Sequence, residues 1–356
     1  MVSNPKPKPK PVRLIDIAAK AGVSRSAVAS VVLQSAGKHV RVSEDTARRI
    51  RGVAQELGYA PNASAQRLAG KRAMLIGVII DSYAPTQRFS QLAEIERAAD
   101  SFGYRVMVGQ SHGEIDKIRA YAADFIANRV DGAICVSHHY PTVGQQVAEA
   151  FLKVPNVVYL GQPLLGEQRA TWVAVDHREA SRQLVEHLHA QGRTRIGLCL
   201  ADPRYRDVQE RRDGFLAGLE SSGLEVDDDR IFHSPPPTRD GAESWHDQAT
   251  AKRVATLARR GRLDAVLAIN DIQAMALIRH LKANDLSVPE QVAVVGYDNL
   301  PMAAVTLPSI TSVDLRISEV ARRGFDLLRR RIDGEALTDK EKRVLLTPRL
   351  IARESG

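Results

Sequence analysis

The polar stretch SRSA at residues 24–27 is the part of this chain best suited to contact nucleic acid. It follows a turn at Gly22–Val23 and begins a short helical pattern. An arginine at the start of an exposed helix can donate two hydrogen bonds to guanine, a pairing that discriminates by about 1–3 kcal/mol. Arg25 could instead contact a phosphate or be an ordinary exposed arginine. The candidate DNA-contacting residues here are Ser24, Arg25, Ser26, Ala27 and Ser30.

Three short helices are expected to position this stretch. Apolar residues within 14–21 follow helical spacing, and Gly22 is typical of a helix C-terminus. Ser24 is a suitable N-cap for the second helix. Ser43 is the expected cap of a third helix that ends at Gly58. The pattern predicts a small all-α head that resembles a helix–turn–helix.

The charge of the chain is concentrated in this head. Residues 1–72 contain 14 Lys and Arg against 4 Asp and Glu, a net charge of +10. The other 284 residues contain 36 against 38, a net charge of −2. A basic head on a nearly neutral body favours contact with DNA phosphates.

Beyond residue 73, strand-like apolar runs alternate with amphipathic helical runs. Such alternation predicts parallel sheets with helices on both faces. A second set begins near Thr171, which predicts two similar lobes facing each other across a cleft. The expected fold is therefore a small all-α domain followed by an α/β core of two similar lobes with parallel sheets.

No apolar run reaches the length of about 18 residues that a membrane span requires. The N-terminal stretch MVSNPKPKPKPVR also lacks the apolar segment of a secretory signal. We therefore expect a cytoplasmic protein without membrane contact. Cys135 and Cys199 lie in strand-like runs and are expected to be buried thiols, neither a disulfide nor a metal pair.

Enzyme signatures such as GxSxG, a P-loop, HExxH and GxGxxG are absent from the sequence. Asp227 and Asp229 form a carboxylate pair in an acidic loop and are expected to be solvated. The run at 138–140 (HHY) could contact a ligand, hold a metal or be an ordinary loop, and no third metal ligand stands out. Trp245 could line the cleft or begin a helix. We expect no catalysis, no metal and no cofactor.

The order and spacing of short motifs along the chain resemble the lactose repressor family of bacterial transcriptional regulators. These motifs include RLIDIAAKAGVS, VSEDTARRI, ELGYAPN, SAQRLAGKR, RRDGF, AIND, VVGYDN, ITSVD and TPRLIARES. The resemblance implies a homodimer on a near-palindromic operator in double-stranded DNA, and a periplasmic-binding-protein-like core. It also implies a hinge helix that folds on specific DNA, and a cleft whose small ligand changes DNA affinity.

The resemblance also sets the expected domain limits. They are a disordered basic tail at 1–11, a helix–turn–helix domain at 12–60, a hinge at 61–72 and a two-lobe core for effector binding and dimerisation at 73–356. Within the core, the first lobe is expected at about 73–173 plus 317–343, and the second at about 174–314 plus 345–356.

By this resemblance, Asn62 to Leu68 would form the hinge helix. Ala65 would approach minor-groove bases, and Leu68 would insert at a central base step as an apolar lever. A plain interface role for Leu68 is the alternative. The second helix departs from the family pattern at Ala27 and Ser30, so its operator cannot be copied from relatives.

The resemblance places effector contacts at the carboxyl ends of the core strands. Arg211 would reach into the cleft, while Asn270 and Asp298 would add an amide and a carboxylate; together they could hold a polyol or a purine edge. A surface ion pair for Arg211 and helix capping for the other two are the alternatives. Phe89 would supply an apolar wall. Gln162 stands beside Gly161 where an acid and an arginine are common, so a sugar-like contact there is in doubt.

The sequence predicts a sequence-specific DNA-binding regulator, and a repressor in particular. A sugar or related metabolite is expected to change its affinity for the operator. The alternative is a solute-binding receptor with the same core, which would leave the basic head unexplained. Neither the effector nor the direction of the response follows from the sequence.

Overall fold

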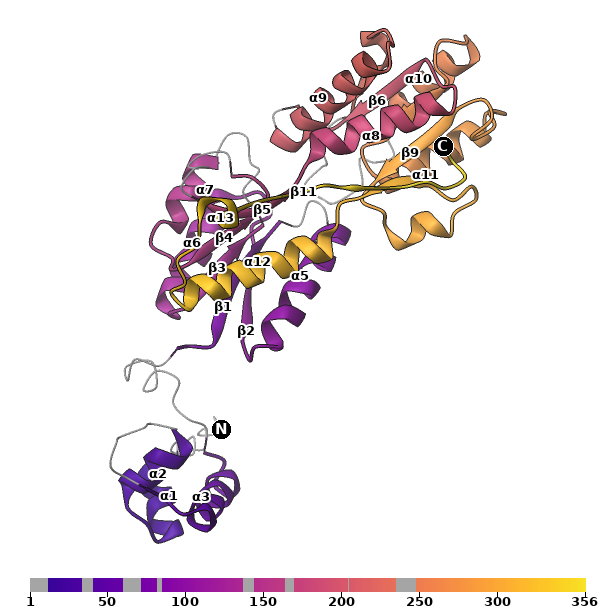
Figure 1. Cartoon of the computed structure of the whole chain (residues 1–356). Helices are drawn as coiled ribbons and strands as arrows, with labels where there is room; N and C mark the ends of the chain where they lie inside the picture. The colour runs from indigo at the N-terminus through magenta and orange to yellow at the C-terminus, as the bar shows by residue number, and fades with distance from the viewer. Residues whose placement is uncertain are drawn as a thin grey trace, which may run out of the picture. The chain divides into compact units, whose positions relative to one another are not determined.

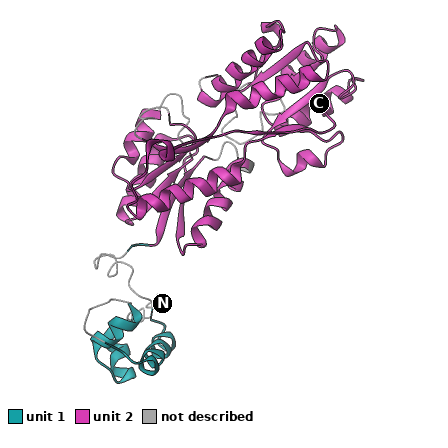
Figure 2. Cartoon of the chain, viewed as in Figure 1, with its two compact units in different colours: residues 1–73 teal, residues 74–356 magenta. Residues whose placement is uncertain are grey.

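The computed structural model describes residues 12–33, 41–59, 72–81, 85–136, 144–163, 170–203, 205–234 and 248–356. The chain divides into two compact units, Met1–Ala73 and Met74–Gly356 (Figure 2). Each unit has a hydrophobic core of its own. The expected tail at 1–11 and most of the expected hinge at 61–72 lie outside the described residues.

The first unit is built on three helices, α1 (Leu14–Ala21), α2 (Arg25–Val32) and α3 (Glu44–Glu56). Gly22 ends α1 with a φ of 63°, which a glycine adopts without strain. Ser24 begins α2 by accepting a hydrogen bond from the backbone N–H of Ala27 at 3.2 Å. Val28 and Ile50 are fully buried at the centre of the bundle. The expected three-helix head and both serine caps are thus present.

The first lobe of the second unit contains a six-stranded sheet among the described residues, in the order β11-β5-β4-β3-β1-β2. All its neighbouring strands run parallel. The strands are β1 (Leu75–Ile80), β2 (Arg105–Gln110), β3 (Gly132–Cys135), β4 (Val157–Leu160), β5 (Thr171–Val175) and β11 (Arg343–Leu346). The helices are α5 (Pro85–Asp100), α6 (Ile115–Ala127), α7 (Gly144–Phe151), α12 (Ile317–Ile332) and α13 (Asp339–Lys342).

The second lobe repeats this plan in the order β12-β10-β9-β8-β6-β7. Its strands are β6 (Ile196–Leu200), β7 (Ile231–His233), β8 (Ala265–Leu267), β9 (Ala293–Tyr297), β10 (Thr311–Asp314) and β12 (Arg349–Ile351). The helical segments are α8 (His177–Ala190), α9 (Arg206–Ser221), η1 (Asp228–Arg230), α10 (Gln248–Arg259), α11 (Asp271–Lys282) and η3 (Pro301–Ala304). The last strand, β12, is antiparallel to β10, an exception to the all-parallel expectation.

The chain crosses between the lobes three times, after β5, after β10 and between β11 and β12 (Figure 1). Because β5 leads from the first lobe into the second and β10 leads back, the carboxyl ends of the two sheets face each other. The expected lobe limits at 173 and 343 fall inside β5 and β11, so the first sheet extends beyond both. Loops at these strand ends are where α/β folds bind ligands.

One apolar cluster runs through both lobes. It joins the α5 and α12 side of the first sheet to the α8 and α9 side of the second, with fully buried side chains such as Ile76 and Leu328. The opposite faces form separate clusters under α6 and α7 and under α10 and α11. Cys135 and Cys199 are buried, as predicted, and neither forms a disulfide with a described residue.

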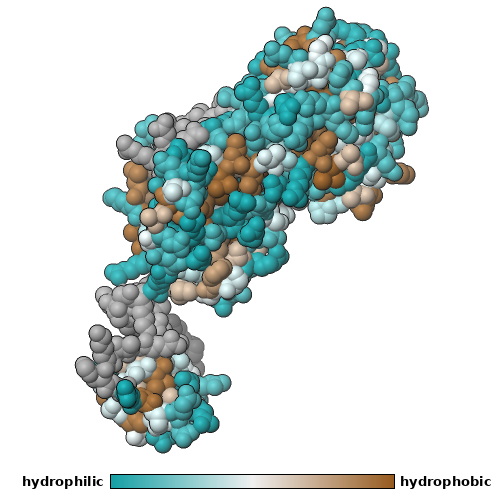
Figure 3. All heavy atoms as spheres, in the orientation of Figure 1, coloured by the Kyte–Doolittle hydropathy of each residue, from teal (hydrophilic) through white to brown (hydrophobic). Residues whose placement is uncertain are grey.

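The surface of the second unit is mainly hydrophilic in the view of Figure 3, with apolar atoms in separate smaller areas. Of the helices described, none combines the length and apolar character needed to cross a bilayer.

Candidate functional site

Helix α2 presents the polar residues predicted to contact DNA. Ser24, Arg25 and Ser26 are exposed, while Ala27 and Ser30 are partly buried. Arg25 forms no hydrogen bond or ion pair with the described residues, so its guanidinium is available to an outside partner. The hydroxyl of Ser24 is engaged in the helix cap. Asn62, Ala65 and Leu68 lie outside the described residues, and their roles stay predictions.

A cavity lies between the two lobes of the core and opens to solvent; the space measures about 670 Å³, open solvent included. Its lining comes from α5, from the ends of β4, β5 and β10, and from α9 and the start of α12. The polar lining residues are Gln87, Arg88, Gln91, Gln162, His177, Arg206, Asp207, Glu210 and Arg211; the apolar ones include Leu160, Val173, Leu315, Ile317 and Val320.

Arg211 is fixed in this cavity by two contacts. Its Nη1 donates to the backbone oxygen of Ile269 at 2.7 Å. Its guanidinium carbon lies 4.0 Å from the centre of the Tyr297 ring, a favourable cation–π contact. The Nε of Arg211 is buried and has no hydrogen-bond partner among the described residues. The side chain is therefore held in the cavity by a hydrogen bond and a cation–π contact, and it forms no ion pair with the described residues. Its role as a ligand-binding group stays a prediction.

Arg88 enters the same cavity from the first lobe. It lies on α5, and its Nη1 donates to Gln91 Oε1 over a long 3.4 Å. Its Nε is also buried and has no hydrogen-bond partner in the part of the chain that the structure describes. Burial lowers the pKa of Arg88 from its usual value, an effect opposed by the charges of Asp81, Asp207 and Asp298.

Asp298 lies between the lobes at the end of β9. Its Oδ1 accepts a hydrogen bond from Gln87 Nε2 of the first lobe at 3.3 Å. Both residues line a second cavity beside the first, on the side of α5 and α12. Burial raises the pKa of Asp298, while the positive charges of Arg211 and Arg88 oppose the rise. This residue therefore contacts the opposite lobe and does not cap a helix.

The buried carboxylate of Asp271 stabilises the turn that carries Asp298. Asp298 has a φ of 98° and Asn299 a φ of 51°, both in the left-handed region. Asp271 accepts hydrogen bonds from the N–H of Leu300 and from the hydroxyl of Ser312, each at 2.6 Å. A Cβ at Gly296 would lie 2.2 Å from Asp271 Oδ1, so only glycine leaves room for this carboxylate.

Two of the predicted effector residues lie elsewhere. Asn270 lines neither cavity; its Oδ1 accepts from the N–H of Gln273 at 2.9 Å and caps α11, which is the alternative that the sequence left open. Phe89 is 48% exposed and lines neither cavity. It lies one residue, or about 100° of helix rotation, from Arg88, so it faces away. The apolar wall comes from the strand ends instead.

Gln162 does line the cavity, and its Oε1 is buried with no hydrogen-bond partner from the described residues. The sequence reasoning missed Arg88 and the α9 group of Arg206, Asp207 and Glu210. Arg206 and Glu210 form an ion pair at 2.8 Å. Burial is the main cause that raises the pKa of Glu210. The spacing of four residues between Arg206 and Glu210 was the sequence signal that could have predicted this ion pair on a helix.

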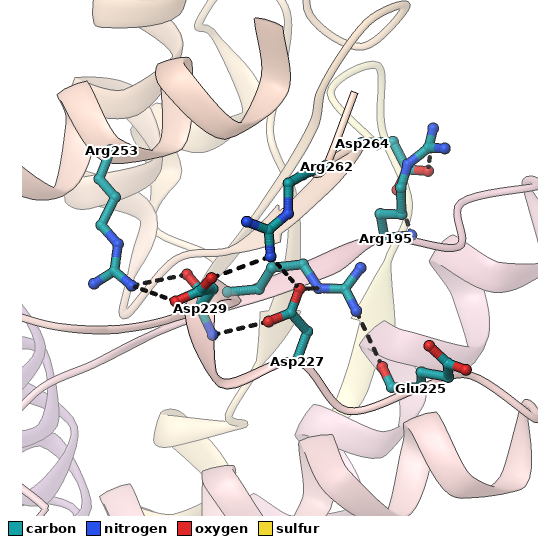
Figure 4. A network of polar contacts seen from close by, with 8 residues as sticks. Arg195, Glu225, Asp227, Asp229, Arg253, Arg262 and Asp264 are labelled. Carbon is teal, nitrogen blue, oxygen red and sulfur yellow. Dashed lines mark hydrogen bonds and ion pairs between the residues drawn. The ribbon is translucent and has the colours of Figure 1, made fainter. Parts of the chain in front are cut away.

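Asp227 and Asp229 are not simply solvated as expected. Arg262 Nη2 lies 3.1 Å from Asp227 Oδ2 and 3.1 Å from Asp229 Oδ2, and Arg253 approaches Asp229 at 3.7 Å (Figure 4). Arg230 adds a contact to Asp227 at 3.5 Å. The carboxylates are thus neutralised in a structural network around η1.

Residues 138–140 and Trp245 lie outside the described residues, among which no cluster of three potential metal ligands occurs.

A basic helical head joined to a two-lobe core with a polar cavity defines a ligand-responsive DNA-binding regulator. Family comparisons agree: residues 13–62 match the model for bacterial regulatory proteins of the lacI family, and residues 185–356 match a periplasmic binding protein-like domain. The transcriptional regulator CelR of Thermobifida fusca is 30% identical over 352 residues, which cover 96% of this chain and 97% of CelR.

Solved structures give the same assignment. The lac repressor dimer bound to operator and the anti-inducer ONPF matches with a TM-score of 0.82 at 26% identity, over 97% of this chain and 99% of that one. The CelR–cellobiose complex matches with a TM-score of 0.68 at 27% identity, over 97% and 100%. The chain belongs to the lacI family of bacterial transcriptional regulators. The alternative of a solute receptor is not favoured, because the head also matches the family.

Proposed function

We propose that this regulator binds an operator as a homodimer and acts as a repressor whose DNA affinity changes when a sugar or related metabolite enters the interlobe cavity. The similar lac repressor structure is a dimer on operator DNA, and the similar CelR structure holds cellobiose. The observation that carries the proposal is the cavity itself. Side chains of both lobes line it, and Gln87 of the first lobe donates a hydrogen bond to Asp298 of the second.

A ligand that contacts both lobes binds their alternative arrangements with different affinities, and this difference is what shifts an equilibrium. We propose that the shift alters how two hinge segments, Asn62 to Leu68 in each protomer, meet on the DNA. The protein would act in the cytoplasm by binding, without catalysis.

The test is selection of binding sites from random duplex DNA by the purified full-length protein. We expect a two-fold symmetric motif, and an affinity that falls steeply with salt because several phosphates are contacted. Failure to enrich a motif, with and without metabolite supplements, would contradict the proposal.

Arg25→Ala tests the role of α2 within this experiment. We expect a relaxed preference at one base pair of each half-site, because the guanidinium of Arg25 is exposed and uncommitted. The affinity for the preferred base should fall about 5- to 150-fold, the equivalent of about 1–3 kcal/mol. Arg51→Ala, which removes an exposed arginine from α3, is the matched control and should leave the motif unchanged. An unaltered motif for Arg25→Ala would rule out base readout.

A further inference from the structure

The first turn of α5, in the first lobe, is bonded to the turn that follows β9 in the second lobe. We propose that Gln87 and Asp298 form an interlobe latch, which holds the lobes in the arrangement of this structure until a ligand in the cavity takes the amide of Gln87. This inference rests on the proposed function, in which the arrangement of the lobes determines operator affinity.

Gln87 lies where a ligand can compete for it. Its Nε2 donates to Asp298 Oδ1 at 3.3 Å, a bond between the two lobes. The same side chain lines both the interlobe cavity and the second cavity that Asp298 lines. A ligand with a hydrogen-bond acceptor at this wall of the interlobe cavity therefore competes with Asp298 for the amide.

Asp298 belongs to a turn that is fixed within the second lobe. The backbone N–H of Asn299 donates to Ser312 Oγ at 3.1 Å, and Asn299 Oδ1 accepts from Arg353 Nη2 at 2.6 Å. Ser312 is fully buried. Because the turn is bonded to its own lobe, a movement of that lobe carries Asp298 along and breaks the bond to Gln87.

Arg88, the next residue of α5, adds electrostatic attraction between the same two elements. It lines the interlobe cavity from the first lobe. Burial lowers the pKa of Arg88, and the negative charges of Asp81, Asp207 and Asp298 oppose the fall. Two of these carboxylates, Asp207 and Asp298, belong to the second lobe. Opposite charges across a partly buried boundary attract more strongly than in bulk water, so they act together with the hydrogen bond.

The strength of the latch is suitable for a reversible change. At 3.3 Å, the bond between Gln87 and Asp298 is long for a hydrogen bond, so we expect it to shift the equilibrium between lobe arrangements by about 2- to 12-fold. A ligand shifts this equilibrium only if it binds the two arrangements with different affinities. A ligand that bonds to the amide of Gln87 meets this condition, because in the latched arrangement that amide already donates to Asp298.

The first test measures the operator affinity of the full-length protein by fluorescence anisotropy without added effector. Gln87→Leu removes the amide, and Gln87→Glu places a second carboxylate beside Asp298. We expect both variants to change the affinity in the same direction, by about 2- to 12-fold for Gln87→Leu and by more for Gln87→Glu, where repulsion is added. Wild-type affinity in both variants, or changes in opposite directions, would overturn the proposal.

Gln145→Leu is the matched control for this test. Gln145 also donates a hydrogen bond to a carboxylate, that of Glu149 at 3.0 Å, but both residues belong to α7 of the first lobe. The control should bind the operator as wild type does. An equal change in Gln145→Leu and Gln87→Leu would show that the loss of any such bond has this effect, and it would also overturn the latch.

A second test follows the lobes without DNA, by electron paramagnetic resonance distance measurement on the full-length protein. Spin labels at Asp124→Cys on α6 and Lys252→Cys on α10, two exposed positions in different lobes, give one interlobe distance when labelled chains are diluted with unlabelled ones. Cys135 and Cys199 are buried, which protects them from the label.

We expect a longer or broader distance distribution in Gln87→Glu than in wild type, and a wild-type distribution in the control. Identical distributions in all three proteins would overturn the latch. If the distances change but no operator can be selected, the latch stands and the proposed function is contradicted, so the two failures are distinguishable.

Discussion

Asp271, the buried carboxylate that bonds to the N–H of Leu300 beside Asp298, makes the stability of the folded protein depend on pH. Burial raises its pKa from 3.8 to about 7, although hydrogen bonds from Ser312 and Leu300 oppose the rise. Between about pH 4 and pH 7 the folded protein therefore keeps a proton on Asp271 that the unfolded chain has released. The contribution of this group to stability is greatest below pH 4 and is lost as the pH rises towards 7.

Asp271→Asn should flatten this part of the pH profile. The slope that Asp271 contributes to the free energy of unfolding is at most about 1.4 kcal/mol per pH unit. We expect the variant to lose less stability than wild type between pH 4 and pH 7 in urea titrations. Asp116→Asn, at a side chain that is 89% exposed, is the control and should follow the wild-type profile. A variant as pH-dependent as wild type would contradict the assignment.

For single residues, the sequence predicts which residue types belong to the site better than it predicts where their side chains point. Arg211 belongs to the RRDGF motif and lines the cavity, whereas Asn270, in the AIND motif, caps a helix. An asparagine at a strand–helix junction suits both roles, so sequence cannot separate them. Arg88 was missed because no motif marks it, and only the course of helix α5, which begins at Pro85, brings its side chain to the cavity.

Among the elements, α8 and α9 are held unusually close by glycine. A Cβ at Gly214 of α9 would lie 2.0 Å from the backbone oxygen of Arg178 in α8, and one at Gly218 would lie 2.7 Å from Val185 Cβ. These two helices cover one face of the second sheet, and α9 carries Arg211. Their spacing therefore contributes to the position of the arginine.

Gly214→Ala should destabilise the core because the added methyl meets backbone that cannot turn aside. We expect a loss of about 1–3 kcal/mol. Gly52→Ala is the contrasting variant: Gly52 lies inside α3 with open space around it, so alanine should stabilise the head by about 0.5–1 kcal/mol. Calorimetric unfolding of both variants measures the effects, and a stabilised Gly214→Ala would show that α8 and α9 can separate freely.

The sequence predicted most elements because their periodicities are strong. Strand β1, which is buried from Ile76 to Ile80, follows an apolar run, and the turn after α1 follows from Gly22. The antiparallel β12 and the edge strand β11 were not predicted, since both are short and their pairing depends on contacts with residues far away in the chain. Non-local pairing is not encoded in local pattern.

In the molecule as a whole, the cavity lies where a bound ligand can contact both lobes of the core at once. Three crossings connect the lobes, one apolar cluster continues through both, and the cavity is lined by side chains of each. Under the proposed function, a ligand bound there would change the balance between lobe arrangements by contacting both lobes. If operator binding depends on the same arrangement, the ligand and the DNA must change each other's affinity by the same factor.

Arg211→Ala tests this coupling. We expect operator affinity without effector to change less than two-fold, because Arg211 belongs to the core and Arg25 to the separate head unit. The change in operator affinity on adding effector, typically 5- to 150-fold in coupled systems, should disappear. Fluorescence anisotropy with the selected operator measures both quantities, and Arg322→Ala serves as the control. A variant that still binds the effector with wild-type affinity and responds fully would remove Arg211 from the site, whereas one that binds but no longer responds would assign to Arg211 the transmission of the signal between the lobes.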